Sequence, residues 1–556
     1  MAILKPLSWL QDYSTTKLKG DIFAGLTVGV LLIPQSMAYA LIAGLPVIYG
    51  LYASLVPQIM YALFGSSRQL SVGPTAMDSL LIASGLGILA VIGSQEYIQL
   101  AIILTLMVGV IQTFLGFMRM GFITQLLSKP IISGFTSAAA VLIGLNQLGP
   151  LLGINMEKGN IIVLFISIVT NLANIDILTA SIGLFSILLL YAFKKWAPKL
   201  PGTLIIVFTS IGMVHFLELH LSGLNVIGEI PMGLPRFNLP KIDLGQMTLL
   251  LPLALTLALI SFIESFSVGK NLALQSKDHI VNANTELVAL GSANFIGAFF
   301  MSFPVTGGFG RSAVNFSAGA QTPFSGVISA CLIALTLLFF TDIFALLAYP
   351  VLAAIILVAL RNLIDFKYPY KLSRTHFLDF FMLSFTLIIT LFFGIIWGIF
   401  SGMGLYVLLL VYKSIFPKIQ VKPFDENGEA LPVPTENSKT TKNHPLVILK
   451  IDTPIITINI ESIEQQINQH MILSNPDSHV LLIDLSTVQY IDSSGIKGIK
   501  RLIMQLNEKN IRILWYSLHP PLDEIFTVKK MISGPMEKTL FKDSTAAIEF
   551  LRKEGN

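Results

Sequence analysis

Three ionisable residues lie inside long apolar stretches of this sequence. Glu264 stands in LALISFIESFSVGK, Arg311 in TGGFGRSAVN and Asp78 in GPTAMDSLL. A charged side chain within a membrane-spanning helix costs several kcal/mol, so residues of this kind are functional candidates. A buried carboxyl can bind and release a proton, and a guanidinium can hold an anion through charged hydrogen bonds. The residue types therefore indicate proton and anion chemistry.

Each of the three residues has a functional and a structural interpretation. Glu264 fits a proton carrier, because burial disfavours the charged carboxylate; the alternative is a structural carboxylic acid held by hydrogen bonds. Arg311 fits direct anion binding or compensation of the charge on Glu264; the alternative is a structural ion pair. For Asp78 we expect an outward-facing or paired acid, because an ionised carboxylate would repel an anion at that helix start. A second proton site is the other interpretation of Asp78.

Two interrupted apolar segments place a helix N-terminus in the middle of the membrane. One starts at Pro74 after GSSRQLSV, and the other starts near Gly308 after PVTG. They are third in each set of seven segments, and short segments interrupted by glycine or proline at matching positions indicate a transporter binding site. A helix N-terminus carries unpaired N–H groups and the positive end of the helix dipole. Two such ends that face one another can bind an anion.

The elements that must position these residues are membrane-spanning helices. The chain has 556 residues, of which 54% are hydrophobic and 12% charged, against roughly 25% charged in soluble domains. A chain this apolar fits the bilayer as its solvent. Residues 1–416 contain about fourteen apolar segments: 22–41, 47–64, 74–92, 97–118, 122–147, 176–194, 202–219, 248–275, 284–303, 308–319, 322–340, 342–362, 376–393 and 395–416.

The distribution of basic residues predicts the orientation in the membrane. The second, fourth, sixth, eighth, twelfth and fourteenth segments are followed by lysine or arginine, as at Arg119 after the fourth and Lys194 after the sixth. Because basic loops stay on the cytoplasmic side, both termini are predicted to be cytoplasmic. We expect a multi-pass protein of the cell inner membrane.

The composition changes sharply near Pro417. Residues 417–445 are polar and contain several prolines, which predicts a linker. Residues 446–556 read as a small soluble α/β domain. In it VLLIDL is a buried strand, and a turn at DSSG leads into an amphipathic helix over Ile496 to Leu506.

The sequence contains none of the common signatures of an enzyme. It has no GxxxxGK[ST] phosphate loop, no HExxH zinc motif and no convincing nucleophile elbow. We therefore expect no catalytic activity, no cofactor, no metal site and no nucleic-acid partner. Without an ATP site, primary active transport by this chain alone is disfavoured as well.

Two long blocks of the sequence resemble the SulP anion permeases, the sulfate permease family that includes prestin and pendrin. The blocks are IPQSMAYALIAGLPVIYGLYASLVPQIMYALFGSSRQLSVGPTA and ELVALGSANFIGAFFMSFPVTGGFGRSAVNFSAGAQTP. LLIDLSTVQYIDSSGIKGIKRL is similar to the STAS domain, which is fused to many members of this family. The resemblance covers nearly the whole chain.

The resemblance implies a seven-plus-seven inverted repeat with a core and a gate domain, followed by a cytoplasmic STAS domain. It implies an anion held between the N-termini of the third and tenth helices, alongside the first helix. Carried over by motif, the substrate-binding residues are Gln35, Tyr39, Thr75, Gly308, Phe309, Gly310 and Arg311. Glu264 matches the acidic position of the eighth helix, where it would carry the coupling proton.

The sequence departs from the family pattern at several positions. Many relatives have serines where this chain has Gly308 and Gly310. Members that use sodium with bicarbonate have aspartate at the position of Glu264 and a hydroxyl one turn later, where this chain has Val268. Because sodium needs several hard oxygen ligands, these departures favour protons over sodium.

The expected function is secondary active transport of inorganic anions, with proton-coupled uptake of sulfate or a similar oxyanion. One alternative is a bicarbonate or chloride transporter or exchanger, sodium-coupled or uncoupled. Another is a membrane-anchored anion sensor that signals through the STAS domain. The expected partners are a small inorganic anion, protons, membrane lipid, a second copy in a homodimer, and a cytoplasmic protein at the STAS domain.

The DSSG turn carries a candidate regulatory residue. In STAS relatives that act as anti-sigma-factor antagonists the second serine of this turn, here Ser494, is phosphorylated, and a helix start accepts a phosphate. The alternative is that Ser493 and Ser494 only cap the helix that follows.

Overall fold

The computed structural model describes residues 7–10, 13–125, 128–157, 159–197, 202–241, 243–276, 281–361, 364–417, 419–422, 446–474, 480–516, 540–541, 546–547 and 549–550. The chain divides into two compact units, Met1–Tyr406 and Val407–Asn556. The first unit is helical and the second is built on a β-sheet, each with its own hydrophobic core.

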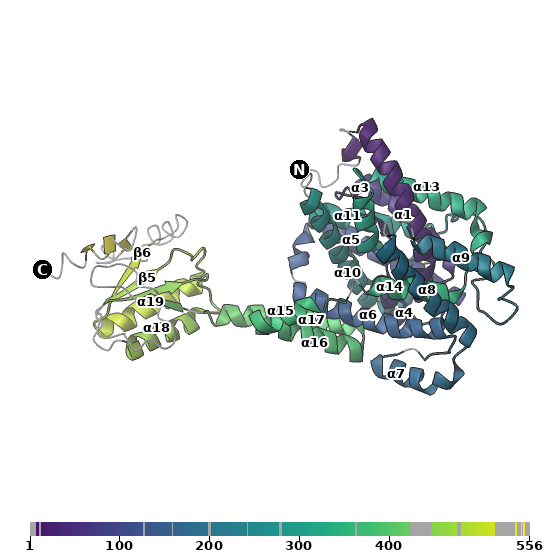
Figure 1. Ribbon diagram of the computed structural model, residues 1–556. Coiled ribbons are helices and arrows are strands. Elements are labelled where there is room, and N and C mark those ends of the chain that lie inside the picture. The colour runs from purple at the N-terminus through teal and green to yellow at the C-terminus, as the bar shows by residue number, and fades with distance from the viewer. Residues whose placement is uncertain are drawn as a thin grey trace. The chain divides into compact units, whose positions relative to one another are not determined.

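The first unit is made of helices, most of them apolar, and the last of them, α17 (Ile395–Ile415), continues past the end of the unit at Tyr406 (Figure 1). Their bounds are α1 (Thr15–Ile42), α2 (Val47–Ala53), α3 (Val56–Phe64), α4 (Ala76–Leu86), α5 (Gln95–Phe117), α6 (Lys129–Leu152), α7 (Ile161–Thr170), α8 (Ile177–Trp196), α9 (Gly202–Phe216), α10 (Leu244–Ser276), α11 (Ala283–Ala298), α12 (Phe309–Ser317), α13 (Phe324–Phe339), α14 (Tyr349–Leu360), α15 (Lys367–Thr375), α16 (Phe377–Phe393) and α17 (Ile395–Ile415). Within the described residues, 7 helices are long and apolar enough to cross a membrane, and further apolar helices have 10–17 residues. A helical membrane unit followed by an α/β domain is confirmed, and the count of fourteen spans stays a prediction.

The helices of the first unit pack as two groups. In one, which we call the core group, α11 lies along α5 and α3, α1 lies along α13, and α4 and α12 contact α10. In the other, the gate group, α14 packs on α6 and α8, while α9 packs on α8 and α16 on α6. Close approach in the core group depends on small residues: a methyl group added to Gly109 of α5 would lie 2.3 Å from the backbone nitrogen of Phe295 on α11.

Two short strands bring the starts of α4 and α12 together. β1 (Val72–Gly73) pairs antiparallel with β2 (Thr306–Gly307), with Val72 opposite Gly307. Gly307 lets the Leu70 side chain lie close to the strand, because a methyl group added there would lie 2.6 Å from that side chain. Each strand is followed within three residues by a helix start, so this pairing sets two helix N-termini beside one another.

The second unit contains a five-stranded sheet in the order β3-β4-β5-β6-β7. Strands β4 to β7 run parallel and β3 is antiparallel at the edge. The bounds are β3 (Ile419–Lys422), β4 (Leu446–Ile451), β5 (Val480–Asp484), β6 (Arg512–Tyr516) and β7 (Leu540–Phe541), with helices α18 (Ile460–Ser474) and α19 (Ser493–Glu508). Buried apolar side chains of β5, such as Leu481 and Ile483, pack with Leu502 of α19 in one core. The strand and helix expected around the DSSG turn are thus present.

One boundary of the sequence prediction needs correction. Residues 419–422, assigned to the linker, form β3 and pair with Ile448–Ile451 of β4. A short strand at a sheet edge gains its hydrogen bonds from a partner distant in the sequence, so local composition does not reveal it. The rest of the predicted linker, from residue 423 to 445, lies outside the described residues.

Candidate functional site

All eight residues predicted for the anion and proton sites line one cavity of about 900 Å³ in the first unit. The cavity lies between the core group (α1, α4, α10 and α12) and the gate group (α8, α9 and α14). Gln35 and Tyr39 come from α1, Thr75 caps α4, Glu264 lies on α10, Gly308 caps α12, and Phe309, Gly310 and Arg311 form the first turn of α12.

The start of α12 presents backbone donors to the cavity. Its first intrahelical hydrogen bond is donated by the Ser312 amide to the Gly308 carbonyl (3.0 Å). The N–H groups of Phe309, Gly310 and Arg311 precede that bond and have no acceptor within the helix. Together with the positive end of the helix dipole, they make this wall of the cavity favourable for an anion.

The start of α4 is capped differently. Thr75 has extended backbone, and its side-chain oxygen accepts a hydrogen bond from the Asp78 amide (3.4 Å). The first backbone hydrogen bond of the helix runs from Ser79 to the Thr75 carbonyl (3.0 Å). Thr75, Ala76 and Met77 all line the cavity, so the second helix N-terminus also meets it.

Arg311 joins the two helix starts. The side chain is 4% exposed, and its Nη1 donates to the Pro74 carbonyl, 2.7 Å away. Its Nε and Nη2 atoms have no acceptor among the described residues. These two nitrogens form one edge of the guanidinium, and such an edge binds two oxygens of a carboxylate or phosphate-like group at once. In this conformation both nitrogens are buried and unused by the described residues, in the arrangement that a two-point contact with an oxyanion requires.

The two glycines that replace the serines of many relatives differ in their surroundings. A methyl group added to Gly308 would lie 2.8 Å from Cζ and Nη2 of Arg311, whereas one added to Gly310 would meet nothing within 4 Å. The absence of a side chain at Gly308 thus allows the guanidinium to lie over the helix start. Gly310 instead leaves open space in the cavity.

Glu264 projects from α10 into the same cavity. Its Oε2 is buried and has no hydrogen-bond partner within the described part of the chain. Glu264, Arg311 and Tyr39 interact electrostatically with one another, and no described ion pair joins Glu264 to Arg311. The alternatives of a closed structural ion pair and of a hydrogen-bonded structural acid therefore find no support in this geometry.

The expectation for Asp78 was wrong. It is 0% exposed, and neither carboxylate oxygen has a hydrogen-bond partner among the residues that the structure describes, so it is neither outward-facing nor paired. Most of α4 is enclosed by other helices, so the helix has no broad polar face. Without such a face, the sequence does not show which side of the helix points to solvent. The sequence pattern thus held no information on the orientation of Asp78.

A buried polar network that the sequence did not reveal holds β2 in place. The Asn294 side chain bonds both backbone groups of Val305, with Nδ2 donating to its carbonyl (3.1 Å) and its amide donating to Oδ1 (2.9 Å). Ser265 accepts from the Gly307 amide (2.6 Å) and shares a hydrogen bond with Thr306 (2.7 Å). Since Ser265 follows Glu264 directly, the network couples the acidic position on α10 to the start of α12.

The cavity also reaches Lys194, a basic residue whose place in the sequence predicted only the orientation of the chain in the membrane. Lys194 is exposed at the end of α8 and lines the cavity with Phe193, Gly202 of α9 and Leu360 of α14. These are helix ends that the basic-residue pattern places at the cytoplasmic surface. A fixed positive charge at a cavity mouth raises the local concentration of anions.

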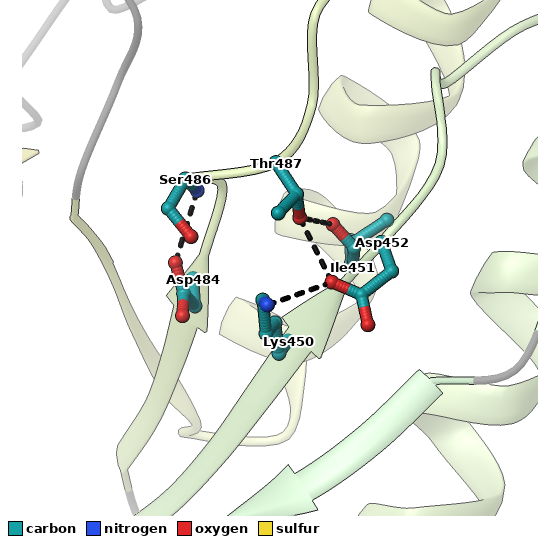
Figure 2. Close-up of polar contacts among 6 residues, drawn as sticks. All are labelled: Lys450, Ile451, Asp452, Asp484, Ser486 and Thr487. Atoms are coloured by element: carbon teal, nitrogen blue, oxygen red, sulfur yellow. Dashed lines mark hydrogen bonds and ion pairs between the residues drawn. The ribbon is translucent and has the colours of Figure 1, made fainter. Parts of the chain in front are cut away.

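Polar contacts in the second unit gather at the carboxyl ends of β4 and β5 (Figure 2). The Thr487 hydroxyl donates to the Ile451 carbonyl and to Asp452 Oδ1, both at 2.9 Å, and Lys450 pairs with Asp452 at 2.9 Å. The Ser486 amide donates to Asp484 Oδ1 (2.9 Å). These contacts fasten the loop after β5 to the end of β4.

Asp492 caps α19, which corrects the alternative that Ser493 and Ser494 do so. Its Oδ1 accepts from the Gly495 amide (2.7 Å), and its Oδ2 accepts from the amide and hydroxyl of Thr457 (2.8 Å each). These hydrogen bonds hold the pKa of Asp492 below its ordinary value, and the one from the Gly495 amide has the largest effect. An acid that accepts three hydrogen bonds outcompetes a neutral hydroxyl for the cap position. Ser494 is half-buried in the first turn of the helix.

Comparison with known proteins identifies the family and the fold of the chain. Residues 18–386 match the family model described as the sulfate permease family, and residues 437–541 match the STAS domain. The chain is 34% identical to the chloroplastic sulfate transporter 4.1 of Arabidopsis thaliana over 91% of this chain and 76% of that protein. It is 29% identical to the sodium-independent sulfate anion transporter of Bos taurus, over 96% and 88% respectively. The fold is similar to that of murine Slc26a9 in the inward-facing state, with a TM-score of 0.89, 24% identity, and coverage of 99% of this chain and 94% of that one.

Proposed function

The chain belongs to the sulfate permease family, and on that premise we propose that it takes up sulfate or a similar oxyanion together with protons. The observation that carries the proposal is that two residues lining one cavity have atoms with no hydrogen-bond partner among the described residues: Nε and Nη2 of Arg311 and Oε2 of Glu264. The first supplies a two-point oxyanion contact, and the second supplies a proton site within electrostatic range of it.

The anion is held between the starts of α4 and α12, with Arg311, Gln35 and Tyr39 around it. Helix N-termini and one guanidinium stabilise negative charge without trapping it as tightly as a cluster of cations would. The second oxygen contact of Arg311 favours a polyatomic oxyanion over chloride, which offers a single centre. Bicarbonate remains an outcome that a substrate panel distinguishes.

Glu264 couples the proton to the anion through charge. An ionised Glu264 competes with the anion for Arg311, so protonation of Glu264 leaves the guanidinium free for the substrate. The loaded core group then moves against the gate group, and the anion leaves through the cavity mouth near Lys194. Both names of the relatives given above are consistent with sulfate as substrate, and that of the bovine relative with independence from sodium.

The proposal is tested by replacing Glu264 with glutamine in purified protein reconstituted into liposomes. Sulfate uptake driven by an inward proton gradient is expected in the wild type and lost in Glu264→Gln, while sulfate binding to the variant stays measurable. The amide has nearly the size of the protonated acid but cannot release a proton. Glu96→Gln, which neutralises an exposed acid at the start of α5, is the matched control.

Two results would contradict the proposal. Proton-driven uptake that persists unchanged in Glu264→Gln would exclude Glu264 as the coupling site. Sulfate binding without turnover in the wild type would instead favour an anion sensor that signals through the STAS domain. A panel of sulfate, bicarbonate and chloride, each with and without sodium, separates the remaining transport alternatives.

The wider setting is also part of the proposal. We place residues 1–416 in the inner membrane with both termini cytoplasmic, and assign residues 446–556, together with the edge strand β3, to the STAS domain. A homodimer is expected, with a cytoplasmic protein partner at the STAS domain. Phosphorylation of Ser494 would add negative charge at the start of α19 but beside the Asp492 carboxylate, so it would alter that surface.

A further inference from the structure

Asp78 is an acid that the transport scheme above does not use. It lies in the first turn of α4, one turn after the cap residue Thr75, and is fully buried. Its backbone amide bonds to the Thr75 hydroxyl, but its two carboxyl oxygens bond to no described residue. An acid in such a place needs an explanation, because buried polar groups are normally paired.

An ionised Asp78 would be poorly compensated. Removing a carboxylate from water costs several kcal/mol even after relaxation, while a helix N-terminus returns roughly 0.3–2 kcal/mol. The nearby cation, Arg311, is already shared between the Pro74 carbonyl and the charge of Glu264. A proton on Asp78 removes this cost, because the neutral acid carries no charge to desolvate.

The packing of α4 on α10 places Asp78 near the level of Glu264. A methyl group added to Gly85 would lie 2.4 Å from the side chain of Leu253, so the two helices touch there. α4 starts at the cavity and runs away from it to Gly85, whereas α10 runs from Leu253 toward the cavity at Glu264, so the two helices run in opposite directions. From that contact, 7 residues back to Asp78 and 11 residues forward to Glu264 correspond to about 10 Å and 16 Å along the axes. The two carboxyls therefore differ by roughly 6 Å in height.

Glu264 is the group among the described residues whose charge acts on Asp78. The helices packed against α4 are α1, α5, α6 and α10. Their titratable and charged residues are Lys17, Lys19, Asp21 and Tyr39 on α1, Glu96 and Tyr97 on α5, Lys129 on α6, and Glu264 and Lys270 on α10. Two acids that repel one another in a shared interior release their protons in linked steps.

We propose that Asp78 is a second proton site that works with Glu264, so that two protons accompany each divalent oxyanion. The inference rests on the proposed function. Glu264 lines the cavity and Asp78 does not, so protons reach Asp78 by way of Glu264. On entry from outside, one O–H bond forms on each carboxyl, and on release to the cytoplasm both bonds break. Two positive charges and one divalent anion cross together, so the cycle moves no net charge.

The test measures the proton-to-sulfate ratio in liposomes from the sulfate gradient at which net flux stops. Each coupled proton changes this gradient about tenfold per pH unit, since one unit corresponds to about 1.4 kcal/mol. The wild type is expected to change about a hundredfold per pH unit and to ignore the membrane potential. Asp78→Asn, which mimics the protonated acid, is expected to change about tenfold per pH unit and to respond to the potential.

Several outcomes would overturn the proposal. A wild-type ratio of one proton would do so whether or not the variant folds. So would an Asp78→Asn variant that keeps the wild-type ratio, because it would show that the Asp78 proton never leaves. Ser79→Ala removes the neighbouring buried hydroxyl of α4 and serves as the control for packing. No proton-driven uptake by the wild type would refute the proposed function itself, which is a separate result.

Discussion

Replacement of Arg311 by lysine separates the charge of this residue from its shape. The lysine keeps a positive charge at the start of α12, but it loses the Nε and Nη2 edge, which has no acceptor in the described part of the chain. It also loses the Nη1 bond to the Pro74 carbonyl (2.7 Å). If Arg311 acts only as a charge, the substitution changes little. If it binds two oxygens of the anion at once, one of those contacts is lost.

The size of the effect follows from the number of contacts. A hydrogen bond to a charged group contributes about 1.5–3 kcal/mol. The ammonium group of lysine can restore one of the two contacts but not both, because it is a point donor without a planar edge. The loss of one contact corresponds to a roughly 10- to 150-fold weaker sulfate affinity in Arg311→Lys.

The assay is equilibrium binding of sulfate to purified protein at fixed ionic strength, with chloride as a second ligand. Chloride affinity is expected to change far less than sulfate affinity, since a single atom cannot use both nitrogens. Arg374→Lys, on α15 outside the residues that line the cavity, is the matched control. Wild-type sulfate affinity in Arg311→Lys, or equal losses for sulfate and chloride, would refute the two-point contact.

Two further predictions concern the mouth and the floor of the cavity. Lys194→Gln is expected to raise the KM for sulfate about two- to fivefold at low salt, which is the size of effect typical of an exposed charge, and the increase should fade at high salt. Lys195→Gln, outside the cavity lining, is expected to leave the KM unchanged. An increase in KM that does not depend on salt would contradict electrostatic attraction of the anion by Lys194. Gly308→Ala is expected to displace the Arg311 guanidinium, 2.8 Å from the new methyl group, and to weaken sulfate binding about tenfold. Gly310→Ala meets nothing within 4 Å and should bind nearly as the wild type does, so equal losses in both variants would contradict the steric argument.

The sequence determined the helical membrane unit and supplied the set of candidate site residues. Its apolar composition left no soluble alternative, and the breaks before Pro74 and Gly308 marked helix starts at Ala76 and Phe309. These features are local, because glycine, proline and runs of apolar residues act on the chain around them. The family motifs then supplied the named residues, which the structure gathers in one cavity.

The STAS-like unit shows where local patterns end. The strand and helix around DSSG were predictable from alternating apolar residues and a turn. Capping of α19 by the serines was the alternative that the sequence suggested, but Asp492 takes the cap position. Asp492 is held there in part by hydrogen bonds from Thr457, which is distant in the sequence. The sequence did not reveal the edge strand β3, because 23 residues separate its end from the start of its partner β4.

Only the tertiary structure decided the surroundings of the charged residues inside the membrane unit. The sequence placed Asp78, Glu264 and Arg311 inside helices but could not tell which of their atoms are paired, because partners such as Pro74 and Arg311 are separated by more than 230 residues. Most of α4 is enclosed by other helices, so its sequence has no broad polar face that would show which way Asp78 points. Whether the Nε and Nη2 edge of Arg311 and the carboxyl of Asp78 find a partner among the described residues is settled only when the helices are packed together.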